Sequence, residues 1–188
     1  LNGTDLVGYI KQRQLGQVRS LIQGSKVIPK LAIVRTNPDP IVDSYMRLKQ
    51  KYGSEIGVEV DVYTIDQSKA LIKIAELNED SSTHGVIVQI PLPDRSQTDE
   101  VLCAVSAQKD ADGLRPDSVF DAPTPIAISW LLAGYNIELR GKKIVIVGHG
   151  RLVGKPLAKM WQSSDLDIEV ADLKTQDLEA LTILADVL

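Results

Sequence analysis

Three glycines, Gly148, Gly150 and Gly154, stand between a β-branched run and a helical pattern. Glycine lets a backbone approach a phosphate because it has no Cβ, and a helix N-terminus adds free N–H groups and partial positive charge. The spacing differs by one residue from the common G-x-G-x-x-G fingerprint, although the strand and helix around it are the context that the fingerprint requires. The pattern predicts a nucleotide-phosphate site, and the alternative is a glycine-rich turn without a ligand.

A carboxylate follows the next expected strand. In dinucleotide-binding folds, an acidic residue at about this distance after the first glycine commonly accepts hydrogen bonds from the adenosine ribose hydroxyls and repels a 2′-phosphate. Asp172 stands at that distance from Gly148. A helix N-cap is the alternative interpretation of Asp172.

Tyr45 and Lys49 stand one helical turn apart and therefore share a face of the helix expected there, whereas Lys51 points away from both. A lysine that loses part of its hydration beside an aromatic ring becomes a usable acid or base. The alternative is a solvated lysine on a charged helix.

Gln89 is expected near the carboxyl end of a buried strand, where ligand clefts of open α/β sheets form, and it offers both a donor and an acceptor. A buried glutamine satisfied by the backbone is the alternative. Asp110 and Asp112 precede a break in the pattern, and we expect them on opposite sides of an extended segment, one facing a cleft and one facing solvent. The alternative is a charged turn.

The elements that position these residues alternate. Strands are expected at residues 30–34, 58–63, 85–90, 142–147 and 167–171, and another begins at 185–188. Helices are expected at 6–22, 40–56, 66–77, 99–106, 126–134, 153–163 and 175–184, with Asp39 and Asp66 as N-caps. This alternation predicts an α/β fold built from βαβ units with parallel sheets.

Prolines interrupt the segment between residues 113 and 125, where the apolar residues follow neither a helical nor a strand period. We therefore divide the chain into domains 1–121 and 122–188. The first is expected to be an αβα substrate domain with a parallel sheet. The second is expected to be a Rossmann-type domain, which requires a β-α-β-α-β run. The sequence stops as its third strand begins, and we therefore expect this domain to be incomplete as shown.

The bulk composition excludes several function classes. The chain has 188 residues and a net charge of −4. It carries no basic stripe with interleaved aromatics, so nucleic acid is not an expected partner. No apolar run reaches the ~20 residues that span a bilayer, so no membrane contact is expected. Only two histidines are present, which argues against a multi-histidine metal site, and we expect no metal.

The single cysteine, Cys103, cannot form an internal disulfide, which is typical of a cytoplasmic protein. Its neighbours form an expected helix face, and we therefore predict a buried thiol.

The order of these motifs along the chain is more specific than any one of them. They are Tyr45-x-x-x-Lys49-x-Lys51, Gln-Ile-Pro-Leu-Pro at 89–93, Lys-Asp-Ala-Asp-Gly at 109–113, Thr124-Pro125, and the glycine turn ending in Val-Gly-Lys-Pro at 153–156. Together they closely resemble the bifunctional methylenetetrahydrofolate dehydrogenase/cyclohydrolase family over nearly the whole chain.

The resemblance implies oxidation of 5,10-methylenetetrahydrofolate with NAD or NADP and hydrolysis to 10-formyltetrahydrofolate, within one-carbon metabolism and purine biosynthesis. It implies that Lys49 is the acid/base group, that Gln89 hydrogen-bonds Lys49, and that Asp112 holds the pterin. Tyr45 would pack against the folate rings, near Pro91 and Leu92. The residues expected at the cofactor are Gly148, His149, Gly150, Val153, Gly154, Asp172 and Leu173. A homodimer is implied as well.

The glycine turn is also where the chain departs from that family. The family usually has Arg-Ser after the first glycine, where this chain has His149-Gly150, and often a serine where Leu173 stands. Losing an arginine and adding Asp172 both disfavour a 2′-phosphate, so we expect a preference for NAD. The segment from Gly113 to Thr124 is also shorter than usual in the family. Two alternatives therefore remain, a cyclohydrolase with a degenerate cofactor site and a non-catalytic folate- or nucleotide-binding fragment.

Overall fold

The computed structural model describes residues 1–188, which fall into two compact units. One unit is Val7–Phe120, and the other is Asp121–Leu188 together with Leu1–Leu6. None of the helices combines the length and the apolar character needed to cross a membrane.

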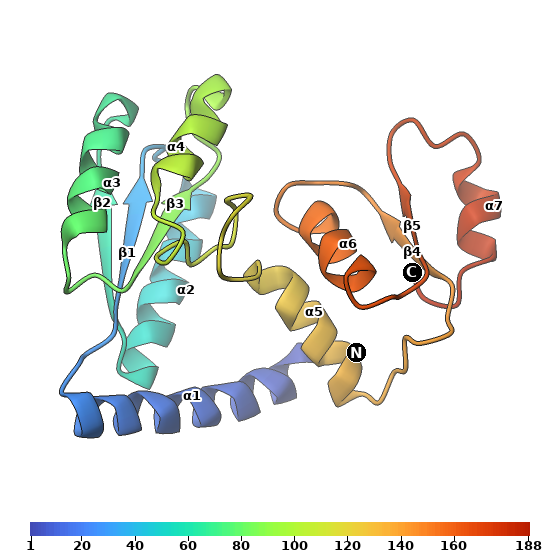
Figure 1. Ribbon diagram of the computed structural model, residues 1–188, viewed down its shortest axis with the longest axis horizontal. Helices are drawn as coiled ribbons and strands as arrows, with labels where there is room; N and C mark the ends of the chain where they lie inside the picture. Colours follow the sequence, from blue (N-terminus) through green and yellow to red (C-terminus); the bar gives the residue numbers. More distant parts are fainter. The chain divides into compact units, whose positions relative to one another are not determined.

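The unit Val7–Phe120 is built on a three-stranded parallel sheet (Figure 1). Its strands are β1 (Lys30–Arg35), β2 (Glu59–Thr64) and β3 (Gly85–Gln89), in the order β2-β1-β3. The register pairs Arg35 with Gln89, so the last residues of β1 and β3 lie side by side. The predicted parallel α/β fold is confirmed.

Helices cover both faces of this sheet. On one face Ile33 and Ile87 pack against Val42 and Met46 of α2 (Pro40–Ile56). The neighbouring strand residues point to the other face, where they meet α3 (Ala70–Glu79) and α4 (Thr98–Ala104). Short 3₁₀ turns at Gln67–Lys69 and Arg95–Gln97 precede these last two helices. Burial on both faces explains the continuous apolar run in β3.

The long α2 begins and ends at local signals. The Asp39 carboxylate accepts hydrogen bonds from the Ile41 and Val42 amides at 2.7 and 3.2 Å, as expected of an N-cap. Gly57 ends the helix in a left-handed conformation, with φ of 83°. The N-cap prediction for Asp66 is wrong, because its side chain makes no capping hydrogen bond and a 3₁₀ turn intervenes before α3 begins at Ala70.

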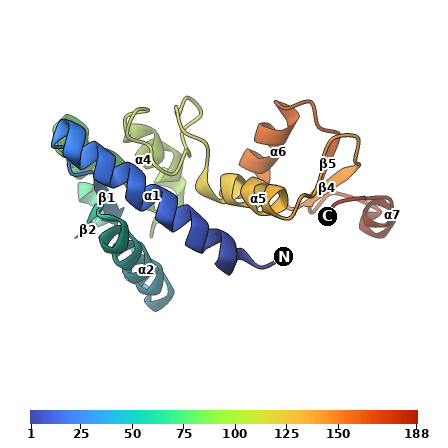
Figure 2. The ribbon, with the colours of Figure 1, turned by 90° about the horizontal axis from the view of Figure 1, so that it is seen from below.

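Helix α1 (Gly3–Ser25) is a single unbroken helix with no fully buried residue (Figure 2). Polar contacts attach it to α2. The Tyr52 hydroxyl donates to Gln14 Oε1 at 2.6 Å, and Lys11 pairs with Glu55 at 2.7 Å. Exposed ion pairs of this kind contribute little, so α1 is held mainly by its partly buried side chains.

The second unit repeats the βαβ pattern on a smaller scale. Strands β4 (Ile144–Val147) and β5 (Ile168–Ala171) pair in parallel and are joined by α6 (Gly154–Gln162). Helix α5 (Pro123–Gly134) comes before β4, and α7 (Leu178–Ile183) follows β5. Val187 forms a parallel bridge to Ile144, so a third strand position begins on the free side of β4.

The core of this unit lies between its two strands and its helices. Ile144 and Ile146 pack with Leu132, Leu157 and Trp161. The Trp161 indole donates to Ser129 Oγ at 2.9 Å, which satisfies the one polar atom of a buried ring.

The prediction of a buried thiol is wrong, because Cys103 is exposed. Helix α4 has only seven residues and directs Val101 and Leu102 into the core. Cys103 follows them on the outward side, since successive residues of a helix cannot all share one face.

Candidate functional site

Lys49 and Gln89 come together from two different elements. Lys49 lies on α2, and Gln89 is the last residue of β3. Gln89 is two residues beyond Ile87, whose side chain packs against α2, so Gln89 faces the same helix. The Lys49 ammonium donates to Gln89 Oε1 at 3.3 Å, and Gln89 Nε2 donates to the Ile90 carbonyl at 3.0 Å. The expected hydrogen bond between Lys49 and Gln89 is therefore present.

Asp112 is the third member of this group. Burial raises the pKa of its carboxyl, the nearby Lys49 cation lowers it, and the Asp110 carboxylate raises it further. The net change in the pKa is upward, so the loss of hydration and the like charge outweigh the attraction to Lys49. Lys49 donates to Gln89 and its charge acts on Asp112, so we treat these three residues as one cluster around Lys49. Gln89 lies at the carboxyl end of β3, and open α/β sheets bind ligands at that end of their strands.

The expectation that Asp110 and Asp112 point to opposite sides of an extended segment is wrong. The segment turns, since the Gly113 amide donates to the Asp110 carbonyl at 3.1 Å and Gly113 has φ of 61°. Asp110 is only 4 % exposed, so neither carboxylate stands free in solvent.

The remaining expected substrate contacts differ in exposure. Tyr45 lies one turn before Lys49 on α2 and is 58 % exposed, so its ring is available to a ligand. The Pro91 carbonyl accepts from Asn37 Nδ2 at 3.5 Å. Leu92, in contrast, is 2 % exposed and packs in the core with α3 and α4.

Gly154 packs closely against the backbone at the start of the glycine turn. A Cβ on Gly154 would lie 1.9 Å from the Gly148 carbonyl oxygen, so only glycine fits at the start of α6. Gly148 has φ of 101°, and its amide donates to the Ala171 carbonyl at 2.7 Å, which ties the turn to β5. A Cβ on Gly148 or Gly150 would meet no atom within 4 Å. This open space over bare backbone, at a helix start without a side-chain cap, fits a dinucleotide pyrophosphate.

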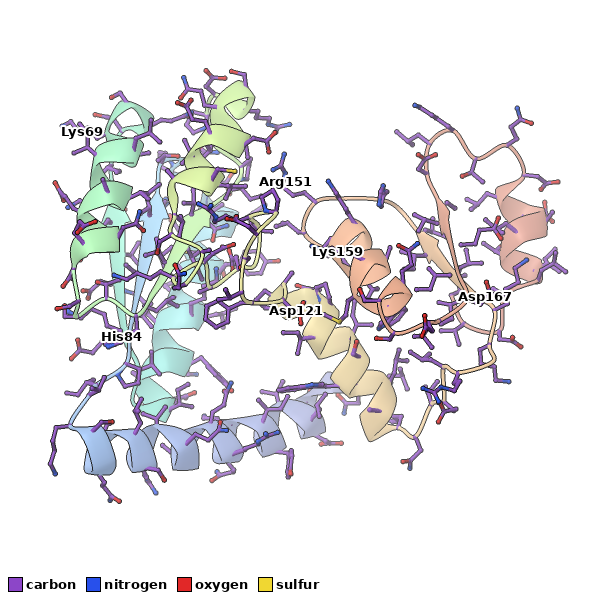
Figure 3. The ribbon with its side chains drawn as sticks, viewed as in Figure 1. Lys69, His84, Asp121, Arg151, Lys159 and Asp167 are labelled. Atoms are coloured by element: carbon purple, nitrogen blue, oxygen red, sulfur yellow. The ribbon has the colours of Figure 1, made fainter.

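His149 and Val153 flank this backbone and are both exposed. Figure 3 shows Arg151 on the same loop and Lys159 farther along α6. The five cofactor residues expected before β5 therefore all lie in or beside the glycine turn; they are Gly148, His149, Gly150, Val153 and Gly154.

Asp172 and Leu173 follow β5 directly. Asp172 Oδ1 accepts from the Lys174 amide at 2.8 Å, and Leu173 is fully exposed. The interpretation of Asp172 as a helix N-cap is wrong, because Asp177 caps α7 by accepting from the Ala180 amide at 2.9 Å.

The other histidine, His84, lies away from both of these groups of residues. The Lys30 amide donates to His84 Nδ1 at 3.1 Å just before β3, at the opposite end of the strand from Gln89 (Figure 3). The structure brings together no group of three or more histidine, cysteine, aspartate or glutamate side chains that could hold a metal ion.

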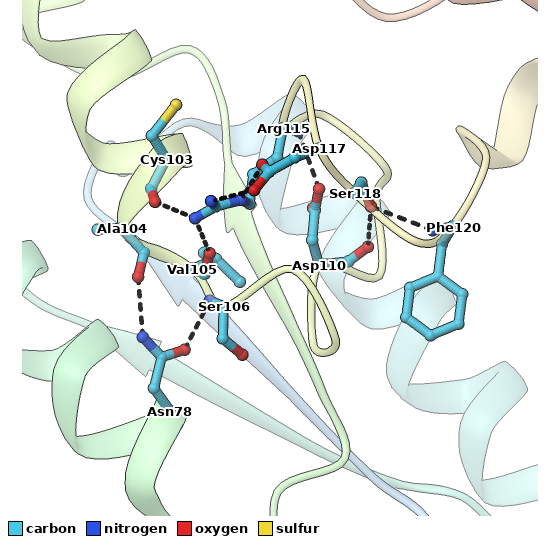
Figure 4. Close-up of polar contacts among 10 residues, drawn as sticks. All are labelled: Asn78, Cys103, Ala104, Val105, Ser106, Asp110, Arg115, Asp117, Ser118 and Phe120. Carbon is cyan, nitrogen blue, oxygen red and sulfur yellow. Dashed lines mark hydrogen bonds and ion pairs between the residues drawn. The ribbon is translucent and has the colours of Figure 1, made fainter.

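Arg115 is a residue that the sequence patterns did not single out. Its guanidinium donates to the Cys103 and Val105 carbonyls, and it pairs with Asp117 (Figure 4). It stands in an irregular segment, where the sequence has no helical or strand periodicity from which the direction of its side chain could be predicted. The only sequence signal for Arg115 was its position, between Gly113 and Pro116 and three residues after Asp112.

Both parts of the chain match models of one protein family. Residues 1–112 match the catalytic domain of tetrahydrofolate dehydrogenase/cyclohydrolase, and residues 122–188 match its NAD(P)-binding domain.

Curated relatives support the same assignment. The bifunctional protein FolD of Methanosarcina barkeri is 32 % identical over 201 residues, which cover 100 % of this chain and 70 % of the relative. FolD of Thermus thermophilus is 36 % identical over 185 residues, covering 92 % and 66 %. The chain thus spans about two thirds of the length of these relatives.

Solved structures have the same fold. The FolD methylenetetrahydrofolate dehydrogenase/cyclohydrolase of Campylobacter jejuni has a TM-score of 0.92 and 32 % identity, over 99 % of this chain and 72 % of that one. The Trypanosoma brucei enzyme, solved with NADP and an inhibitor, also has a TM-score of 0.92, at 23 % identity over 100 % and 70 %. From the matched models, the relatives and the shared fold, we conclude that this chain belongs to the tetrahydrofolate dehydrogenase/cyclohydrolase family.

Proposed function

We propose that this protein oxidises 5,10-methylenetetrahydrofolate to the 5,10-methenyl form with NAD(P), and then hydrolyses that product to 10-formyltetrahydrofolate. The observation that carries the proposal is the hydrogen bond of 3.3 Å between Lys49 and Gln89. Asp112 supports it, because burial raises the pKa of its carboxyl and the Lys49 charge lowers it. A lysine, an amide and a carboxylate supply the proton transfer and the substrate-binding groups that this chemistry needs.

Lys49 is the acid/base group of the hydrolytic step. Water adds to the cationic carbon of the methenyl group, a proton leaves the attacking water, and one carbon–nitrogen bond breaks as its nitrogen takes up a proton. A single amine can carry the proton between these sites. Gln89 orients the amine, because its own amide is fixed by the Ile90 carbonyl and its oxygen accepts from Lys49.

Asp112 and Tyr45 bind the substrate. A carboxylate that has lost its water accepts strongly from the ring N–H and amino donors of a pterin. The exposed ring of Tyr45, one turn from Lys49, offers a flat surface for the folate rings. Pro91 and Leu92 follow Gln89 and shape the adjoining backbone, with Leu92 acting from the core.

The residues proposed to hold the cofactor are Gly148, His149, Gly150, Val153 and Gly154 at the pyrophosphate, with Asp172 and Leu173 at the ribose. When bound, NAD(P) supplies the hydride acceptor. We propose that NAD is preferred over NADP, because Asp172 adds negative charge after β5 while neither His149 nor Leu173 replaces the lost partners of a 2′-phosphate.

One assay tests the proposal. The protein is mixed with methylenetetrahydrofolate and either NAD or NADP, and absorbance follows reduced cofactor and methenyltetrahydrofolate separately. We expect both signals, with a higher kcat/KM for NAD. A strong preference for NADP would remove the cofactor proposal and leave the reaction intact.

A second candidate is a cyclohydrolase without dehydrogenase activity. The observation that favours it is that the Lys49–Gln89–Asp112 cluster is intact while His149-Gly150 replaces the family's usual residues. Hydrolysis of added methenyltetrahydrofolate without cofactor reduction would support it. Binding of folate or nucleotide without either reaction would support a non-catalytic binding protein.

We also propose a homodimer, as the family resemblance implies, and a cytoplasmic location. The mass of the protein in solution, measured by sedimentation equilibrium, tests the first. A monomer at concentrations where the enzyme is active would exclude it.

A further inference from the structure

Arg115 ties an irregular segment to the end of a helix. Its guanidinium donates to the carbonyls of Cys103 and Val105, at and just beyond the last turn of α4 (Figure 4). The same group holds the Asp117 carboxylate through Nε at 2.8 Å and Nη2 at 2.9 Å. A cation on the free carbonyls of a helix C-terminus is favoured by the helix dipole. The side chain is only 19 % exposed, so these contacts are held in place.

The backbone of Arg115 reaches toward the proposed substrate site. Its amide donates to Asp110 Oδ2 at 2.9 Å, and Ser118 Oγ donates to the Asp110 carbonyl at 3.5 Å. Asp110 is the buried carboxylate whose charge bears on Asp112. The segment that follows Asp112 therefore folds back on Asp110, two residues before Asp112.

A second cation holds the other end of the same turn. Lys109 Nζ donates to the carbonyls of Leu77, Asn78 and Asp80 at 2.8–2.9 Å, where α3 ends. Two backbone hydrogen bonds also join this end to β3, from the Val86 amide to Lys109 O and from the Ala111 amide to Val86 O. The turn that carries Asp112 is thus fixed on one side by β3 and α3, and on the other side by Arg115 and α4.

We propose that Arg115 is a positioning residue for substrate binding: it holds the Asp110–Asp112 turn so that the Asp112 carboxylate is placed for the donors of the substrate. This inference rests on the proposed function, because it assigns Asp112 to the folate. The hydrogen bonds and ion pair of Arg115 involve Cys103, Val105, Asp110 and Asp117, and none reaches Lys49 or Gln89. We therefore expect it to act on binding and to leave proton transfer unchanged.

The test compares Arg115→Met and Arg115→Lys with a matched control, Arg95→Met. The control removes one positive charge from an exposed arginine near the start of α4. In Arg115→Met we expect KM for methylenetetrahydrofolate to rise about tenfold, as for the loss of one well-placed charged hydrogen bond. We expect kcat to stay within about twofold and the Kd of the nicotinamide cofactor to be unchanged.

The lysine variant and a local probe make the test specific. Arg115→Lys keeps the charge and can still donate to a helix carbonyl, so we expect a KM rise of about threefold. Amide hydrogen exchange at Gly113 and Arg115 should become faster in Arg115→Met, while exchange in β1 and β3 stays at the wild-type rate. Arg95→Met should match wild type in every measurement.

Three results would overturn the inference. They are wild-type KM in Arg115→Met, a fall in kcat with unchanged KM, and equal effects of Arg95→Met and Arg115→Met. If Arg115→Met does not fold, Arg115→Lys decides, and a wild-type KM in that variant overturns the inference.

A wild-type protein without either activity would instead remove the proposed function. The positioning of the turn is then judged from hydrogen exchange alone, where unchanged rates at Gly113 and Arg115 in Arg115→Met count against it.

Discussion

The amine of Lys49 donates to the side-chain oxygen of Gln89 at 3.3 Å, across 40 positions of sequence. Lys49 lies on helix α2, and Gln89 ends β3, an outer strand of the sheet in the same unit. The contact exists because β3 ends where α2 passes over the sheet. It places an amine at the carboxyl ends of the strands, and the fixed amide of Gln89 limits the directions in which that amine can point.

Replacing Lys49 by Met should abolish hydrolysis of methenyltetrahydrofolate, with a loss of at least about 10²-fold, because no other amine is held by Gln89. The fold should persist, since a long side chain still covers the same surface of α2. Hydrolysis of added methenyltetrahydrofolate measures the effect. Lys51→Met is the matched control, because Lys51 is exposed on the same helix and should be dispensable. Wild-type hydrolysis in Lys49→Met would exclude Lys49 from this role.

Asp112→Asn should make the protein more stable at neutral pH while raising KM for the folate. The folded state raises the pKa of Asp112 above the ordinary value of 3.8, so ionisation costs the folded state free energy. That cost is absent below about pH 3.8, and it grows as pH rises from there through the higher pKa of the folded state. A tenfold change in the acid dissociation constant corresponds to about 1.4 kcal/mol. Urea unfolding over a pH series should therefore show a stability difference that disappears in acid.

Asp117→Asn is the control of opposite sign. The hydrogen bond from Arg115 lowers the pKa of Asp117, so its ionised form favours the folded state above pH 3.8, and this contribution is lost as pH falls through the lowered pKa. Removing this charge should reduce stability slightly at neutral pH. An identical pH profile for the two variants would contradict both assignments.

Gly154→Ala should destabilise the unit that contains the glycine turn. The added Cβ would lie 1.9 Å from a backbone oxygen of Gly148, and backbone cannot move aside cheaply. We expect a loss of about 1–3 kcal/mol in the free energy of unfolding, and no formation of reduced cofactor.

Gly150→Ala separates cofactor binding from folding. Its Cβ would meet nothing within 4 Å, so stability should stay within about 0.5 kcal/mol of wild type. The methyl group would occupy the space proposed for the pyrophosphate, so the Kd for NAD should rise. Tight NAD binding by this variant would show that the phosphates lie elsewhere.

Asp172→Asn should shift cofactor preference toward NADP. The amide oxygen can still accept from the Lys174 amide, so the turn after β5 is kept while its negative charge is removed. We expect the ratio of kcat/KM for NADP to that for NAD to rise about fivefold. Measuring both constants in the same preparation checks this, and an unchanged ratio would mean that Asp172 does not face the 2′ position.

Local sequence signals determined the elements of this protein. Asp39 and Pro40 indicated the start of α2, and the β-branched runs indicated strands that are now seen in parallel pairs. These signals work because helix capping and side-chain periodicity depend on neighbours only a few residues away. The family resemblance, which the order of motifs carries, also implied that Lys49 and Gln89 would meet.

Only the tertiary structure decided the rest. Asp110 and Asp112 were expected on an extended segment, and they instead lie in a turn that hydrogen bonds from β3 and Arg115 hold. Cys103 was expected to be buried, and it is exposed because a helix of seven residues can direct only part of its surface into the core. Arg115 stands in a segment without periodicity, so its direction depends on carbonyls that α4 supplies from ten and twelve residues earlier. Hydrogen bonds to such distant partners leave no repeating pattern in the sequence, and they form only when the sheet and its helices have packed.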